Sequence, residues 1–314
     1  MRTSAAVHCS STLRGPMRAR SQEIYDSTTV TGRGAQCRCY SQTMMTNDKP
    51  LIVLTNDDGV RSPGLAAAVT ALEQLGEVMV VAPLVQQSGT GRSMPNYTSG
   101  AITAQRIAVA GHDYAGYAVD GTPAQCVQRA LLVLAQRPVA LVVAGINYGE
   151  NVGSGITISG TVGAALEAAS MGVAALAISL ETAVDQHHSH SAEVDFRVAA
   201  HFTGVMARLI LAAPRTHDVD VLKVDVPLSA TTGTAWRITR ASRLRYYVPH
   251  AVQSYVLGEP LRLPYGHDTA GAEPDSDAHA IAIGGLVSVT PLSLDMTARV
   301  ELADYEARLR SMIR

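Results

Sequence analysis

The sequence predicts an α/β protein in which helices cover both faces of a mostly parallel sheet. Short apolar runs alternate with helical patterns between residues 51 and 179, as expected when crossover helices connect parallel strands. The composition agrees, because 47% of the 314 residues are hydrophobic and 17% are charged, which suits a globular chain with a sizeable core. No apolar stretch approaches the roughly 18 residues that a membrane span needs.

The first half of the chain has the more regular pattern. Residues 51–54 form an apolar run typical of a buried strand, and Ser62-Pro63 then introduces a helix over 64–75 as a cap residue followed by a first-turn proline. Later strands are expected over 78–82, 102–109, 114–119, 139–144 and 174–179. Later helices are expected over 121–136 and 161–171.

Beyond residue 180 the pattern loosens. Helices are expected over 196–213 and 297–313, and strands over 219–226, 236–240 and 280–291. Residues 245–280 contain Pro, Gly, His and polar residues, which favours an extended arm or loop.

The first 47 residues differ from the rest. They hold six arginines, no lysine and two acids, a net charge of +4, whereas the whole chain has a net charge of −2. Arg-rich, Ser-rich leaders are typical of organelle transit peptides, so mitochondrial targeting is one interpretation. A disordered tail and a translation start at Met44 or Met45 are the other two. The four cysteines show neither a disulfide framework nor zinc spacing, which favours a reducing, cytoplasmic location.

Two adjacent carboxylates, Asp57 and Asp58, follow the first predicted strand. Side by side at the tip of a buried strand they repel each other, and a cation between them relieves the repulsion. Hard divalent cations prefer such oxygen ligands, and the carboxyl edge of a parallel sheet is where open α/β folds bind ligands. A helix cap plus a solvated turn residue is the alternative interpretation.

Other strand ends add polar side chains to the same edge. The loop after the second strand carries Ser88, and the strand over 139–144 is followed by Asn147 and Asn151. Hydroxyl, amide and carboxylate oxygens together predict a Mg²⁺ or Mn²⁺ site. Asn147 and Asn151 as simple turn residues are the alternative.

Ser159-Gly160-Thr161 directly precedes a predicted helix. A helix N-terminus presents free backbone N–H groups and is a ready anion site, to which the hydroxyl groups add donors. Ser159 could instead be an N-cap alone. A metal site beside an anion site predicts phosphate chemistry.

Several segments taken together resemble the SurE family of metal-dependent survival-protein phosphatases. The segments in question are 55–64, 81–83, 87–89, 121–124, 145–153, 159–163, 273–277 and 287–292. The resemblance implies a Rossmann-like three-layer sandwich over 48–314, with an arm over 228–290 that swaps between subunits to give a homodimer or homotetramer.

The resemblance also implies a function and its residues. It indicates a 5′-nucleotidase that hydrolyses nucleoside 5′- and 3′-monophosphates and short polyphosphate, using one divalent metal ion (Mg²⁺ or Mn²⁺) per subunit. The implied metal ligands are Asp57, Asp58, Ser88 and Asn147, of which the two aspartates are also the catalytic residues. The implied phosphate contacts are Asn56, Asn151, Ser159, Gly160 and Thr161. Lys223-Val224-Asp225 departs from the family pattern, which usually has asparagines at the two outer positions.

Other functions have weaker support. The net charge of −2 gives no basic field for nucleic acid. A dinucleotide-dependent enzyme would need a G-x-G-x-x-G turn after the first strand, and an aspartyl-phosphate phosphatase usually needs Asp-x-Asp. A non-catalytic nucleotide-binding protein on the same fold remains the main alternative. The histidine tract at 187–190 is expected to be a solvated loop away from the site.

Overall fold

The computed structural model describes residues 49–187, 191 and 193–313. The predicted boundary after residue 47 and the three interpretations of the preceding segment concern residues outside this part of the chain, and they stay predictions. In the described residues, no helix is both long and apolar enough to cross a membrane.

A single large sheet organises the described residues, with nine strands in the order β3-β4-β2-β1-β5-β6-β7-β11-β8. The strands are β1 (Leu51–Thr55), β2 (Glu77–Pro83), β3 (Ile102–Val109), β4 (His112–Val119), β5 (Val139–Tyr148), β6 (Ala175–Leu180), β7 (Val221–Val226), β8 (Trp236–Ile238) and β11 (Val287–Leu292). From β4 to β7 every neighbouring pair is parallel, whereas β3 pairs antiparallel with β4 and β11 antiparallel with β7. The prediction of a mostly parallel sheet is therefore confirmed.

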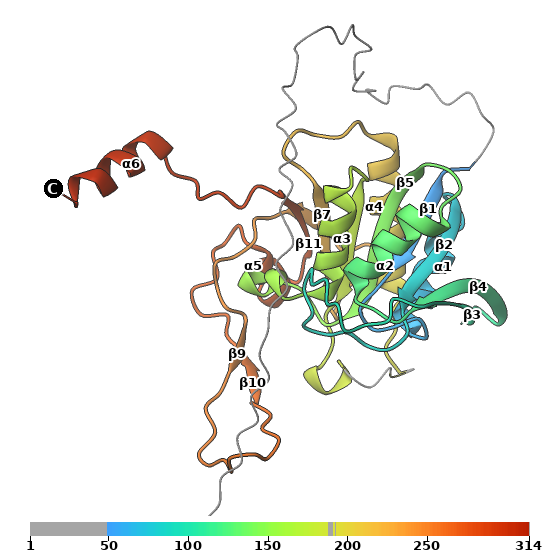
Figure 1. The fold of residues 1–314 in the computed structure, drawn as a ribbon, viewed down its shortest axis with the longest axis horizontal. Helices are drawn as coiled ribbons and strands as arrows, with labels where there is room; N and C mark the ends of the chain where they lie inside the picture. Colours follow the sequence, from blue (N-terminus) through green and yellow to red (C-terminus); the bar gives the residue numbers. More distant parts are fainter. Residues whose placement is uncertain (1–48, 188–190, 192, 314) are drawn as a thin grey trace, which may run out of the picture. The chain divides into compact units, whose positions relative to one another are not determined.

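Helices cover both faces of this sheet (Figure 1). α1 (Pro63–Leu72) packs beside α4 (Arg197–Ala212), and α2 (Pro123–Arg129) packs beside α3 (Gly160–Ser170) on the opposite face. β1 shows the division, because Ile52 and Leu54 belong to the core cluster of α1 and α4 while Val53 belongs to that of α2 and α3. Alternation of side chains along a strand thus produces the expected three layers.

The C-terminal part contains elements of the large sheet and a separate hairpin. β8, α5 (Asp277–Ala282) and β11 are joined to the body, and a separate two-stranded hairpin of β9 (Tyr247–Pro249) and β10 (Tyr265–His267) lies apart from the large sheet (Figure 1). The loop between these two strands exposes apolar side chains, among them Val256, Leu257 and Leu261. The role of the arm in oligomerisation stays a prediction.

One predicted strand was wrong in its first part. Residues 280–291 were expected to be a strand throughout, but Asp277–Ala282 is helical and only Val287–Leu292 is a strand. Ser276 caps the helix by accepting a hydrogen bond from the His279 N–H, and Gly285, with φ of 58°, lies in the turn that follows. The terminal helix α6 (Leu302–Ser311) is shorter than predicted and buries no residue.

Candidate active site at the carboxyl edge of the sheet

The candidate site lies where three neighbouring parallel strands end. β1 leads into Asp57 and Asp58, β2 into the loop with Ser88, and β5 ends at Asn147 and Tyr148. A cavity of about 640 Å³ opens here, and Asp57, Ser88 and Asn147 line it. The sequence-based expectation that these strand ends converge is met by this arrangement.

Asp57 lies against the N-terminus of α3. Its Oδ1 accepts a 2.6 Å hydrogen bond from the Thr161 hydroxyl, and a Cβ at position 160 would lie 2.7 Å from the Asp57 Cβ. A glycine at 160 therefore permits the close approach. Burial raises the pKa of Asp57 above its ordinary value, and the hydrogen bonds from the first turn of α3 oppose this.

Asp58 is equally buried. Its carboxylate accepts hydrogen bonds from Gln86 Nε2 at 3.1 Å and from the Tyr148 N–H at 3.2 Å. Burial, and then the charge of Asp57, raise the pKa of Asp58 to about 8. Two neighbouring buried carboxylates therefore resist simultaneous ionisation unless positive charge is brought to them.

Gln86, which the sequence analysis missed, connects the parts of the site. Its Nε2 lies within hydrogen-bonding distance of Asp58 Oδ1, of Ser88 Oγ at 2.9 Å, and of the His187 carbonyl oxygen at 2.7 Å. Ser88 itself is exposed at the cavity wall. The only signal in the sequence was the position of Gln86 beside the polar Gln87-Ser88 pair.

The side-chain amide of Asn147 has its oxygen available at the cavity, because its nitrogen is already hydrogen-bonded. Its Nδ2 donates to the backbone oxygens of Tyr148 at 3.1 Å and Gly149 at 2.7 Å. The amide orientation is thereby fixed, and Oδ1 is the atom that remains available as an acceptor or ligand.

The donor set fits a hard divalent cation. Asp57, Asp58, Ser88 and Asn147 offer oxygen atoms, which Mg²⁺ and Mn²⁺ prefer, and such ions commonly keep several waters. Among the described residues there is no group of three or more His, Cys, Asp and Glu placed to hold a metal.

The predicted phosphate contacts divide into two groups. Asn151 and Ser159 line the cavity. Ser159 Oγ also caps α3 by accepting from the Val162 N–H at 3.1 Å, and Asn151 Nδ2 donates to Ser179 Oγ at 2.8 Å. Each still has a hydrogen to offer a ligand, because a hydroxyl donates while accepting and an amide nitrogen has two hydrogens.

Asn56, Gly160 and Thr161 lie behind the cavity wall. Asn56 closes the turn after β1 through two hydrogen bonds with the Gly59 backbone, at 3.0 and 3.1 Å. Gly160 and Thr161 contact Asp57, and the Thr161 side chain is fully buried. The first turn of α3 therefore stabilises the Asp57 carboxylate directly.

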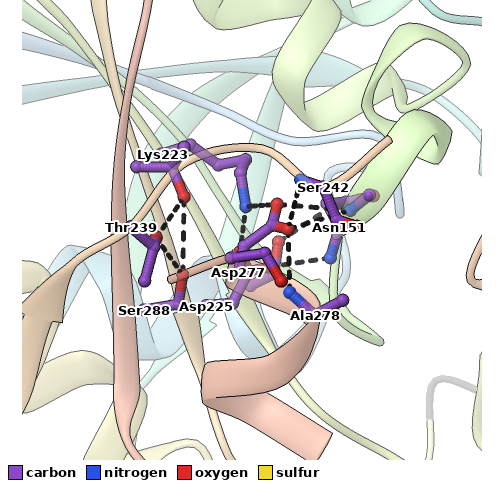
Figure 2. A network of polar contacts seen from close by, with 12 residues as sticks. Asn151, Lys223, Asp225, Thr239, Ser242, Asp277, Ala278 and Ser288 are labelled. Atoms are coloured by element: carbon purple, nitrogen blue, oxygen red, sulfur yellow. Dashed lines mark hydrogen bonds and ion pairs between the residues drawn. The ribbon is translucent and has the colours of Figure 1, made fainter. Parts of the chain in front are cut away.

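A buried ion cluster fixes the loop that carries Asn151 (Figure 2). Lys223 pairs with Asp225 and with Asp277, the latter at 3.1 Å. Asp225 Oδ1 accepts from the Asn151 N–H at 2.7 Å, and Asp277 accepts from the Gly153 N–H at 3.2 Å. Lys223 and Asp225, which depart from the family pattern, therefore stabilise the loop that lines the cavity.

Asp277 also joins this support to the C-terminal part. It accepts hydrogen bonds from the backbone N–H groups of Ser242 at 2.9 Å and Ala278 at 2.8 Å (Figure 2). Burial opposes the charge of Lys223, but the two carboxylates hold its pKa above the ordinary value. The cluster therefore contains its own counter-ion.

Several lining residues were not predicted. They are Glu150, Val184, His187, Arg245, Tyr246, Tyr247 and Tyr265, among others. The expectation that His187 lies away from the site is wrong, because the segment after β6 returns to the edge beside β5. His188 and His190 lie outside the described residues.

Comparisons with known proteins agree with this geometry. The family described as "Survival protein SurE" matches residues 52–248. A protein of Thermococcus gammatolerans named 5′-nucleotidase SurE is 43% identical over 250 residues, which are 80% of this chain and 92% of that protein. Its namesake from Thermococcus kodakarensis is 42% identical over 253 residues, 81% of this chain and 96% of that protein.

A solved structure extends the similarity to the fold. The crystal structure of the SurE protein from Aquifex aeolicus superposes with a TM-score of 0.65 at 29% identity, and the match covers 84% of this chain and all of that one. Both the sequence and the arrangement of the sheet are therefore similar to those of proteins with this name.

Proposed function

The chain belongs to the SurE family, and we propose that it is a divalent-metal-dependent phosphomonoesterase that releases phosphate from nucleoside 5′- and 3′-monophosphates. Relatives that are named 5′-nucleotidase support the 5′ activity. Short polyphosphate is a further substrate in this proposal. The observation that carries the proposal is the buried Asp57–Asp58 pair, which lies among oxygen donors at the edge of a ligand-sized cavity.

Asp57, Asp58, Ser88 and Asn147 would hold one Mg²⁺ or Mn²⁺. When bound, such an ion neutralises phosphate charge and lowers the pKa of a bound water. Asp57 and Asp58 are catalytic residues in this proposal because they keep that charge beside the reacting phosphate. The Thr161 hydroxyl at the first turn of α3 favours the ionised form of Asp57 and so opposes the effect of burial on its pKa.

Asn151 and Ser159 bind the phosphate oxygens. Both line the same cavity as Asp57, and both have a hydrogen for which the described residues provide no acceptor. The backbone of Asn151 is fixed by Asp225, so this donor is held in place before the substrate arrives. Such preorganised donors lower the barrier to phosphoryl transfer by stabilising charge on the equatorial oxygens.

Phosphate release from the full chain tests the proposal. The substrates are 5′- and 3′-nucleoside monophosphates and short polyphosphate, each with EDTA, Mg²⁺, Mn²⁺ or Co²⁺. We expect no release with EDTA and restored release with at least one metal. Folded protein that releases phosphate from no substrate with any metal would favour a non-catalytic nucleotide-binding protein.

We also propose that the β9–β10 hairpin assembles the chain into a homodimer or homotetramer. The exposed apolar residues Val256, Leu257 and Leu261 on its loop support this. Sedimentation of the full chain should give a dimer or tetramer, and Leu257→Asp with Leu261→Asp should shift it toward monomer. A wild-type monomer at micromolar concentration would contradict this part of the proposal.

A further inference from the structure

Glu150 is a buried acid at the cavity that the proposed phosphate chemistry does not use. It follows β5, lines the same cavity as Asp57 and Asn151, and is 2% exposed. Neither of its carboxylate oxygens has a hydrogen-bond partner among the described residues. An unsatisfied buried carboxylate is costly, so its presence at a binding cavity indicates a donor supplied from outside the chain.

Aromatic side chains from the arm surround Glu150. Tyr247 is the first residue of β9 and Tyr246 directly precedes it, and their hydroxyl groups lie near the carboxylate without reaching hydrogen-bonding geometry. Tyr247 Oη is likewise buried without a partner among the described residues. Their rings lie edge to face, 5.1 Å between centroids, and Tyr265 from β10 also lines the cavity.

The two ends of the cavity therefore differ in chemistry. Asp57 with Asn151 and Ser159 forms an end suited to a metal and a phosphate. Glu150 would repel a phosphate, and as a carboxylate it offers two acceptors and no donor. Aromatic faces beside it suit a flat ring. A ligand that satisfies both ends has an anionic group at one end and a ring with adjacent hydrogen-bond donors at the other.

From this polarity we infer that Glu150 recognises the nucleoside part of the substrate by accepting hydrogen bonds from two neighbouring donors, while the arm tyrosines pack against the base. The inference rests on the proposed function for the identity of the substrate. The donor pair is either the ribose 2′- and 3′-hydroxyls or the N–H edge of guanine, since both present two donors side by side. Burial, opposed by the two tyrosines, raises the pKa of Glu150 to about 7, and bound donors would favour its ionised form.

The test compares substrates that differ in these donors. Full-length wild type and Glu150→Gln are assayed with AMP, 2′-deoxy-AMP, GMP and p-nitrophenyl phosphate, which has no donor pair. Glutamine keeps the shape of the side chain but replaces one acceptor by a donor. We expect the ratio of kcat/KM for nucleotides to kcat/KM for p-nitrophenyl phosphate to fall by about tenfold or more, mainly through KM.

The set of substrates whose kcat/KM falls in the variant identifies the donor pair. A loss with AMP and GMP but not with 2′-deoxy-AMP assigns the ribose, and a loss confined to GMP assigns the guanine edge. Equal loss on all four substrates would overturn the inference, because Glu150 would then act on the fold or the chemistry. An unchanged ratio would also overturn it. Asp185→Asn, which removes an exposed carboxylate two residues from His187, is the matched control.

Binding of nucleosides separates this inference from the proposed function. Adenosine and guanosine carry the donor pairs but no phosphate, and their binding to both proteins can be followed by NMR titration without turnover. We expect at least one of them to bind wild type about tenfold more tightly than Glu150→Gln. If the wild type hydrolyses nothing yet shows this difference, the proposed function fails and the recognition by Glu150 stands. If neither nucleoside distinguishes the two proteins, the inference fails.

Discussion

Two buried aspartate pairs in this protein solve the same electrostatic problem in different ways. Asp225 and Asp277 are fully buried, and both pair with Lys223. Asp57 and Asp58 are buried to a similar degree, but the hydrogen-bond partners described for Asp57 are a hydroxyl and backbone N–H groups, with no cation. Burial raises the pKa of Asp57, and burial together with the charge of Asp57 raises the pKa of Asp58 to about 8.

The difference separates support from function. The cluster around Lys223 carries its own positive charge and uses its remaining oxygens to hold backbone N–H groups of the Asn151 loop (Figure 2). Asp57 lines a cavity, and its partners among the described residues carry no positive charge. A buried ion cluster that contains its own cation is a structural element, whereas neighbouring buried carboxylates of raised pKa at a cavity indicate the place where the charge of a ligand enters.

The largest expected effect comes from removing charge at the Asp57–Asp58 pair. Asp57→Asn and Asp58→Asn should each lower kcat for a nucleoside monophosphate by about 10⁴-fold, roughly 5 kcal/mol of transition-state stabilisation, because metal and phosphate positioning are lost together. Steady-state phosphate release at saturating metal measures this. The control is Asp113→Asn, which removes an exposed carboxylate on β4. Near-normal turnover in both site variants would end the proposal that these residues hold the metal.

Removing the cation of the Lys223 cluster should instead lower the free energy of unfolding. Lys223→Met leaves two carboxylates buried without their counter-ion, and we expect the free energy of unfolding to fall by about 3–5 kcal/mol. Urea denaturation at neutral pH measures the loss. Replacing Asp225 and Asp277 by Asn in the same protein should recover much of it. A loss below about 1 kcal/mol would show that the cluster is not the support described above.

How far the sequence predicts this molecule depends on the range of the interactions involved. Apolar runs such as 51–54 correctly indicate buried strands, and strand ends in a parallel sheet must meet at one edge, so Asp57, Ser88 and Asn147 could be brought together from sequence alone. Residues 280–291 were assigned to one strand because apolar composition alone does not separate a short helix from a strand.

The direction of individual side chains and the contacts between residues far apart in the sequence could not be predicted. Whether Thr161 faces a ligand or Asp57 depends on atomic packing, and the structure places its hydroxyl on Asp57. Tyr246 and Tyr247 reach the cavity across about a hundred residues of chain from Glu150, and no local pattern encodes that contact. The part of the site that recognises the substrate is thus the part that sequence periodicity could not reveal.

Glu150 provides a third case in the comparison, a buried acid for which the described residues provide neither an ion-pair partner nor a hydrogen-bond donor. Its pKa is raised from 4.5 to about 7, so the folded state retains a proton that the unfolded chain has lost. Its contribution to stability is therefore complete below pH 4.5 and is lost as the pH rises through 7. In metal-free protein, the free energy of unfolding of Glu150→Gln should rise relative to that of wild type by up to about 3 kcal/mol between pH 4.5 and pH 8.

Chemical denaturation of both proteins across that range measures the gain. Neighbouring titratable groups, namely Glu181, Asp225, Tyr246 and Tyr247, are present in both proteins, so the difference isolates Glu150. A difference in the free energy of unfolding that stays constant with pH would mean that Glu150 finds adequate donors in the native protein, and would weaken its assignment to ligand recognition.

The smallest expected effect is the one that tests metal binding at the Asp57–Asp58 pair without any turnover. A cation that binds only the folded state stabilises it by about 2.7 kcal/mol at one hundred times its dissociation constant. For a chain of this size that corresponds to a rise of roughly 5–10 °C in Tm. Mg²⁺ or Mn²⁺ should raise the Tm of wild type and of Lys223→Met by similar amounts, EDTA should reverse the rise, and Asp57→Asn with Asp58→Asn should abolish it. A rise that survives in the double variant would place the metal elsewhere, whereas a rise lost in Lys223→Met would mean that the supporting cluster also determines the geometry of the metal site.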